Sequence, residues 1–216
     1  MRRDQFGRSQ RARYILITMS ACIVALATAP PSEAQGLQLT PFVGLRYGGS
    51  FTELETGNGI TLNASADFGL IVGIPWKKEH RSFLEIIWSH QDADLATTGA
   101  EPTMLGVDID YLHIGGTAPF ATPHKKLETL LSGGLGATYM RAEIEGSSSA
   151  LFFSASLAGG LRYHLSQRVA LRFDLRGWYT INSSQGAVFC SGGCVIAISS
   201  GGFGQIEATG GVQLSF

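Results

Sequence analysis

Apolar and polar residues alternate with a period of two in the segment from Phe203 to Phe216. One set of alternate positions is apolar or small: Ile206, Ala208, Gly210, Val212, Leu214 and Phe216. The other set is polar: Gln205, Glu207, Thr209, Gln213 and Ser215. Successive side chains of a β-strand point to opposite faces, so this pattern predicts a strand with one face suited to lipid and one suited to a polar interior.

Segments of the same kind, separated by turn-forming residues, recur along the whole chain. The eight strands that they predict cover residues 38–48, 61–75, 82–91, 106–118, 127–141, 151–165, 168–182 and 203–216. Eight is an even number and the lower limit for bacterial outer-membrane barrels. Unpaired backbone groups cannot be left in hydrocarbon, so we expect the last strand to pair with the first. The predicted fold is therefore all-β, an eight-stranded antiparallel up-and-down transmembrane β-barrel.

The connections between the predicted strands alternate between short turns and long loops. The short turns cover residues 75–81, 119–126 and 165–168, and the long loops cover 49–60, 92–105, 142–150 and 183–202. The short turns hold basic residues, namely Lys77, Lys78, Arg81, Lys125, Lys126 and Arg168. The long loops hold acidic residues, namely Glu53, Glu55, Asp92, Asp94, Glu101, Glu143 and Glu145. Outer-membrane barrels place short turns in the periplasm and long loops outside, so length and charge predict the same orientation.

The predicted strand 168–182 has an apolar face and a face that carries Arg172, Asp174 and Arg176. A soluble sandwich would bury the apolar face, whereas a membrane barrel turns it to lipid and encloses the charges. With eight strands and the signal peptide described below, the charged residues are predicted to form a paired network in a lumen that side chains fill. The nine residues of this network are Arg46, Asp67, Glu85, Glu128, Arg162, Arg172, Asp174, Arg176 and Glu207. A narrow ion path or a proton-linked gate is the alternative. The phase of the strand with Asp108 and Asp110 stays open.

The first 34 residues have the layout of a secretory signal peptide. A basic lead with five Arg is followed by an apolar run over residues 14–29 and by Ser32-Glu33-Ala34, which has small residues at the −3 and −1 positions. Residues 1–34 are therefore predicted to be a cleaved signal peptide, and residues 35–216 one outer-membrane barrel domain. Without residues 1–34 the chain has 11 basic and 15 acidic residues, a net charge of −4, which argues against binding to nucleic acid.

Two cysteines, Cys190 and Cys194, lie in the last long loop. The Gly192-Gly193 pair between them allows a tight turn, and the cell exterior permits disulfides. A disulfide between Cys190 and Cys194 is predicted in preference to a metal site, because zinc requires about four ligands and the loop contains no His. We expect neither a metal nor a cofactor in this protein.

Histidines near the rim raise the alternative of a lipid-active enzyme that uses a Ser–His pair. His90 and Ser89 alternate on the predicted strand 82–91 and so point to opposite faces. His113 and Asp110 do not form a firmer pair. The protein is therefore predicted to be no enzyme, although a lipid A- or phospholipid-modifying activity is retained as the less favoured alternative.

Several motifs together resemble a family of small bacterial outer-membrane β-barrel proteins, similar in architecture to OmpA, OmpX and the opacity-type barrels. They are Pro41-Phe-Val-Gly-Leu-Arg-Tyr-Gly-Gly-Ser-Phe51, residues 83–95, residues 107–117, residues 133–138 and Phe189–Cys194. The C-terminal Val212, Leu214 and Phe216 also resemble an outer-membrane insertion signal.

The resemblance implies a fold and a location in the outer membrane. It also implies contact with outer-membrane lipid and lipopolysaccharide and with the machinery that inserts barrels. The expected role is envelope integrity or surface contact through the four long loops, and a porin-like channel for small solutes is the alternative. No reaction follows from the resemblance, because fold does not determine function.

Overall fold

The computed structural model describes residues 36–52, 59–77, 82–97, 104–142, 149–181, 186–190, 194–198 and 201–216. These residues belong to one compact unit, Gln35–Phe216. The predicted signal peptide, residues 1–34, lies outside the described residues. No helix among the described residues has the length and apolar character that a bilayer crossing requires.

Eight long strands make up the barrel, and their bounds agree closely with the period-two segments of the sequence. They are β1 (Gln38–Gly48), β4 (Ser65–Lys77), β5 (Ser82–Thr97), β6 (Met104–Ala121), β7 (Leu127–Ala142), β8 (Ser149–His164), β9 (Val169–Ile181) and β12 (Phe203–Ser215). Four short strands lie in the connections between them: β2 (Ser50–Thr52), β3 (Gly59–Leu62), β10 (Gly186–Cys190) and β11 (Cys194–Ile198). The last two pair with each other in a separate hairpin.

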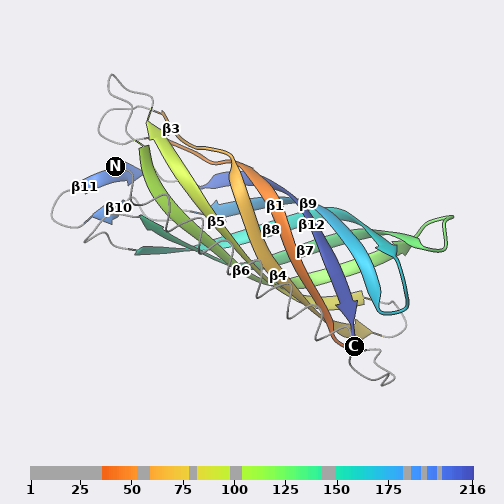
Figure 1. The fold of residues 1–216 in the computed structure, drawn as a ribbon. Coiled ribbons are helices and arrows are strands. Elements are labelled where there is room, and N and C mark those ends of the chain that lie inside the picture. The colour runs from red at the N-terminus through yellow and green to blue at the C-terminus, as the bar shows by residue number, and fades with distance from the viewer. Residues whose placement is uncertain are drawn as a thin grey trace. The chain divides into compact units, whose positions relative to one another are not determined.

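The long strands close into a barrel of antiparallel neighbours (Figure 1). Around the barrel the order is β5-β4-β1-β12-β9-β8-β7-β6, and β6 pairs again with β5. The seam joins the first and last strands, with Gln38 opposite Ser215 and Gly48 opposite Gln205. The predicted closure of the last strand on the first, and the fold class with it, is confirmed.

Two of the predicted boundaries are wrong. The segment 92–105 was predicted to be a long loop, but β5 continues to Thr97 and β6 begins at Met104. Cross-strand pairing runs without a break from Asp92 opposite Asp108 to Ala96 opposite Met104. The aspartates had suggested a solvated loop, whereas they occupy alternate positions of a strand whose other face is apolar. The predicted strand 61–75 is likewise divided between β3 and β4.

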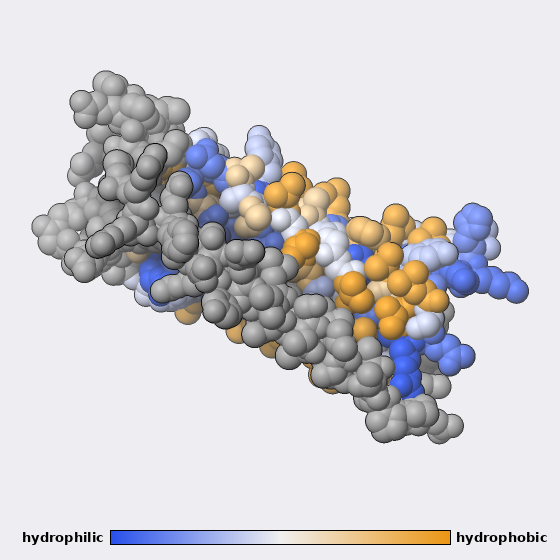
Figure 2. Space-filling view, in the orientation of Figure 1, coloured by the Kyte–Doolittle hydropathy of each residue, from blue (hydrophilic) through white to orange (hydrophobic). Residues whose placement is uncertain are grey.

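The outer face of the barrel is apolar, and the charged side chains lie inside. Val43, Ile114, Leu157 and Leu175 are each more than half exposed, although they lie in the middle of their strands. Figure 2 shows hydrophobic residues gathered on this surface, with hydrophilic residues at the end that carries the short turns. An exposed apolar band of this kind is the lipid-facing surface of a transmembrane barrel.

The phase of β6, which the sequence left open, is settled by the burial of its side chains. Ile109 and Tyr111 are fully buried inside the barrel, whereas Leu112 and Ile114 are exposed outside. Asp108 and Asp110 share the outer face with Leu112 and Ile114, and the pairing of β6 with β5 and β7 shows no shift in register. The aspartates therefore lie on the outer wall beyond the apolar band, at the end of the barrel opposite the short turns.

We expect Leu175→Arg to destabilise the barrel by about 2–4 kcal/mol, the cost of Arg facing lipid near the midplane. Leu165→Arg is the matched control, because Leu165 is also exposed but lies in the turn between β8 and β9. Equilibrium unfolding by urea in phospholipid vesicles measures both variants. Equal free energies of unfolding for the two variants would contradict the assignment of the apolar face to lipid.

Candidate functional site in the barrel interior and at the rim

The structure places all nine predicted network residues in the interior of the barrel. Each is at most 6% exposed, and each belongs to a strand position whose neighbours face lipid. Their contacts divide them into three groups that follow one another along the barrel. We call them the turn-side tier (Glu128, Arg162), the middle tier (Glu85, Arg172, Asp174) and the rim-side tier (Arg46, Asp67, Arg176, Glu207).

The turn-side tier lies where β7 begins and β8 ends. Arg162 donates two hydrogen bonds to Glu128 Oε2, from Nε at 2.9 Å and from Nη2 at 2.6 Å. His164 Nε2 lies 3.1 Å from the same oxygen, and Arg162 Nη1 lies 3.4 Å from Gln213 Oε1. The guanidinium also lies over the ring of Phe83, 5.7 Å from its centroid. Strands β5, β7, β8 and β12 are thus joined across the lumen.

The middle tier joins opposite walls through a single arginine. Arg172 donates to both carboxylate oxygens of Glu85, at 2.6 and 3.3 Å. Its Nε donates to Asp174 Oδ2 at 2.7 Å. A two-pronged contact between guanidinium and carboxylate is among the strongest charge-assisted hydrogen bonds. Glu85 belongs to β5 and Arg172 to β9, so this pair spans the lumen.

Arg46 is the centre of the rim-side tier. It contacts Glu207 Oε1 at 2.6 Å and Asp67 Oδ2 at 3.4 Å, and it also donates to Ser89. The indole of Trp178 donates to the other oxygen of Glu207 at 2.9 Å. The Arg46 guanidinium also lies 5.4 Å from the centroid of the Trp178 ring, a cation–π distance.

Glycines on the inner face make room for two of the carboxylates. A Cβ at Gly44 would lie 2.7 Å from Asp67 Oδ1, and a Cβ at Gly160 would clash with Asp174 Oδ1. Real Cβ atoms essentially never come this close to another atom. The absence of a side chain at Gly44 and Gly160 is therefore a packing requirement of the charged interior.

Beyond the rim-side tier the interior becomes neutral. Tyr111 donates to Gln205 at 2.8 Å, and His113 Nε2 lies 2.7 Å from Ser154 Oγ. Towards the rim, apolar side chains fill the barrel in what we call the apolar cap, formed by Val107, Ile109, Met140, Ala142 and Phe203. The sequence analysis did not identify this cap. Its signal is the alternation itself, which continues through β5, β6 and β7 with apolar residues turned inward.

The candidate catalytic histidines do not assemble an accessible Ser–His pair in the described part of the chain. His113 contacts Ser154 and Ser156, but its side chain is fully buried. Ser89 points into the lumen and contacts Arg46, whereas His90 lies on the outer wall, as the sequence predicted. Neither histidine therefore presents a nucleophile to a substrate.

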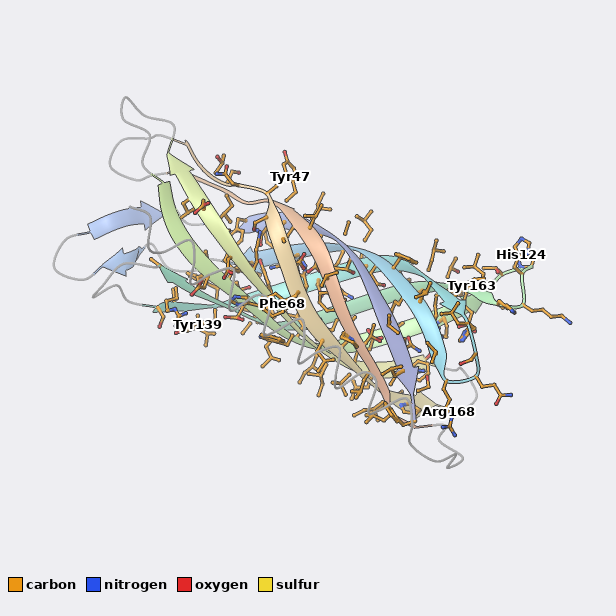
Figure 3. All side chains as sticks on the ribbon, in the orientation of Figure 1. Tyr47, Phe68, His124, Tyr139, Tyr163 and Arg168 are labelled. Carbon is orange, nitrogen blue, oxygen red and sulfur yellow. The ribbon has the colours of Figure 1, made fainter. Side chains whose placement is uncertain are left out.

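The outer wall carries a cluster of charged residues at the rim-side end of the apolar band. His90 Nδ1 lies 2.9 Å from Asp110 Oδ1, and His90 Nε2 lies 2.9 Å from Asp92 Oδ1. Asp108 accepts hydrogen bonds from Arg141, with Nε at 3.1 Å. We call His90, Asp92, Asp108, Asp110 and Arg141 the rim cluster. Phe68 and Tyr139 occupy strand positions that pair with His90 and Asp110. Figure 3 shows Tyr139 on the side of the barrel away from Tyr163, His124 and Arg168, and Phe68 between them.

The predicted cysteine pair and the predicted insertion signal both lie at the ends of strands. Cys190 and Cys194 oppose each other in the pairing of β10 with β11, while their side chains lie outside the described residues. In the predicted insertion signal, Val212 pairs with Leu171 and Leu214 with Leu39. Phe216 exchanges backbone hydrogen bonds with Gly36 and Leu37, at 3.2 and 3.0 Å.

No protein-family model matches the chain, and no curated protein sequence matches it. Solved structures do match the chain. The structure of Neisserial surface protein A (NspA) is similar with a TM-score of 0.62 and 13% sequence identity, over 85% of this chain and 99% of that one. The N-terminal β-barrel domain of Pseudomonas aeruginosa OprF matches with a TM-score of 0.46 at 13% identity, over 85% and 99%. Ail, the attachment invasion locus protein of Yersinia pestis, matches at 0.42 and 13%, over 84% and 99%.

The chain has the fold of an eight-stranded outer-membrane barrel. At 13% identity the likeness to NspA concerns the path of the backbone. The residues that fill the lumen and line the rim are therefore interpreted from their own contacts.

We expect Arg46→Met to cost about 3–5 kcal/mol of stability, because it leaves two buried carboxylates, Glu207 and Asp67, without their central cation. Arg141→Gln is the control, since it also removes an ion-paired arginine but one whose side chain is 60% exposed. Exposed pairs contribute little. Urea unfolding of both variants in vesicles measures the difference, and a loss in Arg46→Met no larger than in Arg141→Gln would contradict a coupled rim-side tier.

Proposed function

We propose that this protein is a non-catalytic integral protein of the bacterial outer membrane with a closed lumen, which serves envelope integrity or contact at the cell surface. The observation that carries the proposal is that nine buried charged side chains in the interior contact one another or neutral partners. Its apolar outer face supports the location, because a β-sheet satisfies all its backbone groups in a bilayer only when it closes into a barrel.

The lumen is closed by two different barriers. The three ionic tiers fill an interior that, with eight strands, is just wide enough for side chains. An ion that entered would have to displace pairs such as Arg172 with Glu85, whose members are each only 2% exposed. The apolar cap adds a segment in which a permeating ion would meet mainly apolar side chains, and this costs free energy.

The side of the barrel opposite the short turns is where contact with other molecules would occur. Strands β5 and β6 extend this side beyond the apolar band, and the strand ends that the four predicted long loops connect lie on it. The partners are outer-membrane lipid and lipopolysaccharide. Insertion of the barrel depends on the machinery that reads the C-terminal strand through Val212, Leu214 and Phe216.

We expect the wild-type barrel to give no discrete current steps in a planar lipid bilayer. The protein for this test is purified from outer-membrane fractions and shown to be folded by a heat-dependent shift in its mobility in SDS. Arg172→Ala is the matched variant, since it removes the middle tier but leaves the apolar cap intact, and it should also stay closed. Current steps in the wild-type protein would establish the porin-like alternative, and steps in Arg172→Ala alone would show that the ionic tiers are the only barrier.

A mature chain of residues 35–216 with a disulfide between Cys190 and Cys194 is part of the same proposal. Opposed residues of an antiparallel pair have Cα atoms about 4.5 or 5.5 Å apart, within the usual range of about 4.4–6.8 Å for a disulfide. We expect the intact mass of the purified, unreduced protein to equal that of residues 35–216 less two hydrogen atoms. If treatment with an alkylating reagent adds two alkyl groups without prior reduction, the disulfide is excluded. A heavier chain would show that cleavage occurs before residue 35.

A further inference from the structure

The rim cluster contains groups that converge as metal ligands do. One ligand atom from each of His90, Asp92 and Asp108 lies within 4.8 Å of the other two. The strand pairing imposes this arrangement, because His90 and Asp92 are alternate residues on the outer face of β5 and Asp108 lies directly opposite Asp92 on β6. Sites built on paired strands hold their geometry better than sites on loops.

The surroundings of His90 orient its ring. Asp110 faces Nδ1 at 2.9 Å, and the Trp88 indole in turn donates to Asp110 at 3.2 Å. The ring also packs against Phe68, with centroids 5.2 Å apart. A carboxylate on one ring nitrogen of a histidine is the usual support of a histidine that binds a metal through the other.

The other nitrogen, Nε2, faces a second carboxylate, Asp92 Oδ1, at 2.9 Å. When Nδ1 carries the proton donated to Asp110, Nε2 is a bare lone pair, and two acceptors then face each other. Either a second proton or a bound cation must lie between them. Because the His90 side chain is 20% exposed and that of Asp92 75% exposed, a cation can reach this position from solvent.

We propose that His90, Asp92 and Asp108 form a binding site for a divalent cation of the zinc class on the outer wall of the barrel. One imidazole and two carboxylates suit Zn²⁺, which binds nitrogen and carboxylate oxygen at about 2.0–2.2 Å. Three protein ligands leave an open position that a water molecule or a phosphate oxygen can fill. Asp110 is a positioning residue. Arg141 competes with the cation, since it already contacts Asp108.

The test is titration of the refolded, full-length barrel in detergent with Zn²⁺ by calorimetry and with Co²⁺ by visible absorption. All proteins carry Cys22→Ser, Cys190→Ser and Cys194→Ser, so that thiolates do not contribute. We expect one ion per chain in this background, no ion in His90→Gln or Asp92→Asn, and about 10–100-fold weaker binding in Asp110→Asn, the usual effect of losing an outer-shell partner. Arg141→Gln should bind more tightly, because it frees Asp108 and removes a positive charge.

Asp94→Asn is the matched control, because Asp94 is the next outward residue on β5 and is exposed, yet lies outside the cluster. His124→Gln controls for any exposed imidazole. Both should bind like the background protein, and every variant must keep its heat-dependent mobility shift. Absence of binding in the background protein would overturn the proposal. An equal loss in Asp94→Asn would also overturn it, in favour of unspecific attraction to surface charge. Neither result depends on the closed lumen.

Discussion

The hydrogen-bonded seam between β1 and β12 is the contact on which the rest of the structure depends. In hydrocarbon an open sheet edge would leave a row of backbone groups without partners, each at a cost of several kcal/mol. The seam removes both edges at once, and its pairing runs from Gln38 opposite Ser215 to Gly48 opposite Gln205. Closure with eight strands also fixes the width of the barrel, and an eight-stranded interior is just wide enough for side chains.

The narrow interior of the barrel determines which polar groups it can hold. Four arginines share the lumen with five carboxylates. The desolvation cost of each buried charge is offset only when a partner of opposite sign lies beside it. Glu207 shows the consequence, because it accepts hydrogen bonds from Arg46 and Trp178 and also lies 4.0 Å from Arg176. Such buried groups contribute little net stability over an apolar filling, but removal of one member is costly. The network therefore favours the observed register of the strands over registers shifted by one or more residues.

Much of this could be predicted from the sequence, because alternation reports directly which residues share a face. It identified the eight strands, the closing pair and the nine inward charges. It could not identify partners, since Arg172 reaches Glu85 only through the register and tilt of strands that are 87 residues apart in the chain. The alternation pattern was also misread where the surroundings of the outer wall change from lipid to water. Asp92 and Asp94 suggested a loop, whereas they lie on the outer face of β5.

The reversal of polarity along β5 and β6 separates the barrel into two physical regimes. Within the apolar band, apolar side chains face lipid and charged side chains face the lumen. Beyond the band, water is outside, so Ile109 turns inward and Asp108 outward without any change in strand phase. The continuous hairpin of β5 and β6 thus has apolar side chains outside at one end, as in a membrane barrel, and apolar side chains inside at the other, as in a soluble protein. The charged side chains of the lumen contact one another or neutral partners, whereas on the outer wall the side chains of Asp92 and Arg141 are 75% and 60% exposed. Chemistry directed at other molecules is therefore expected on the wall at the rim and not in the channel.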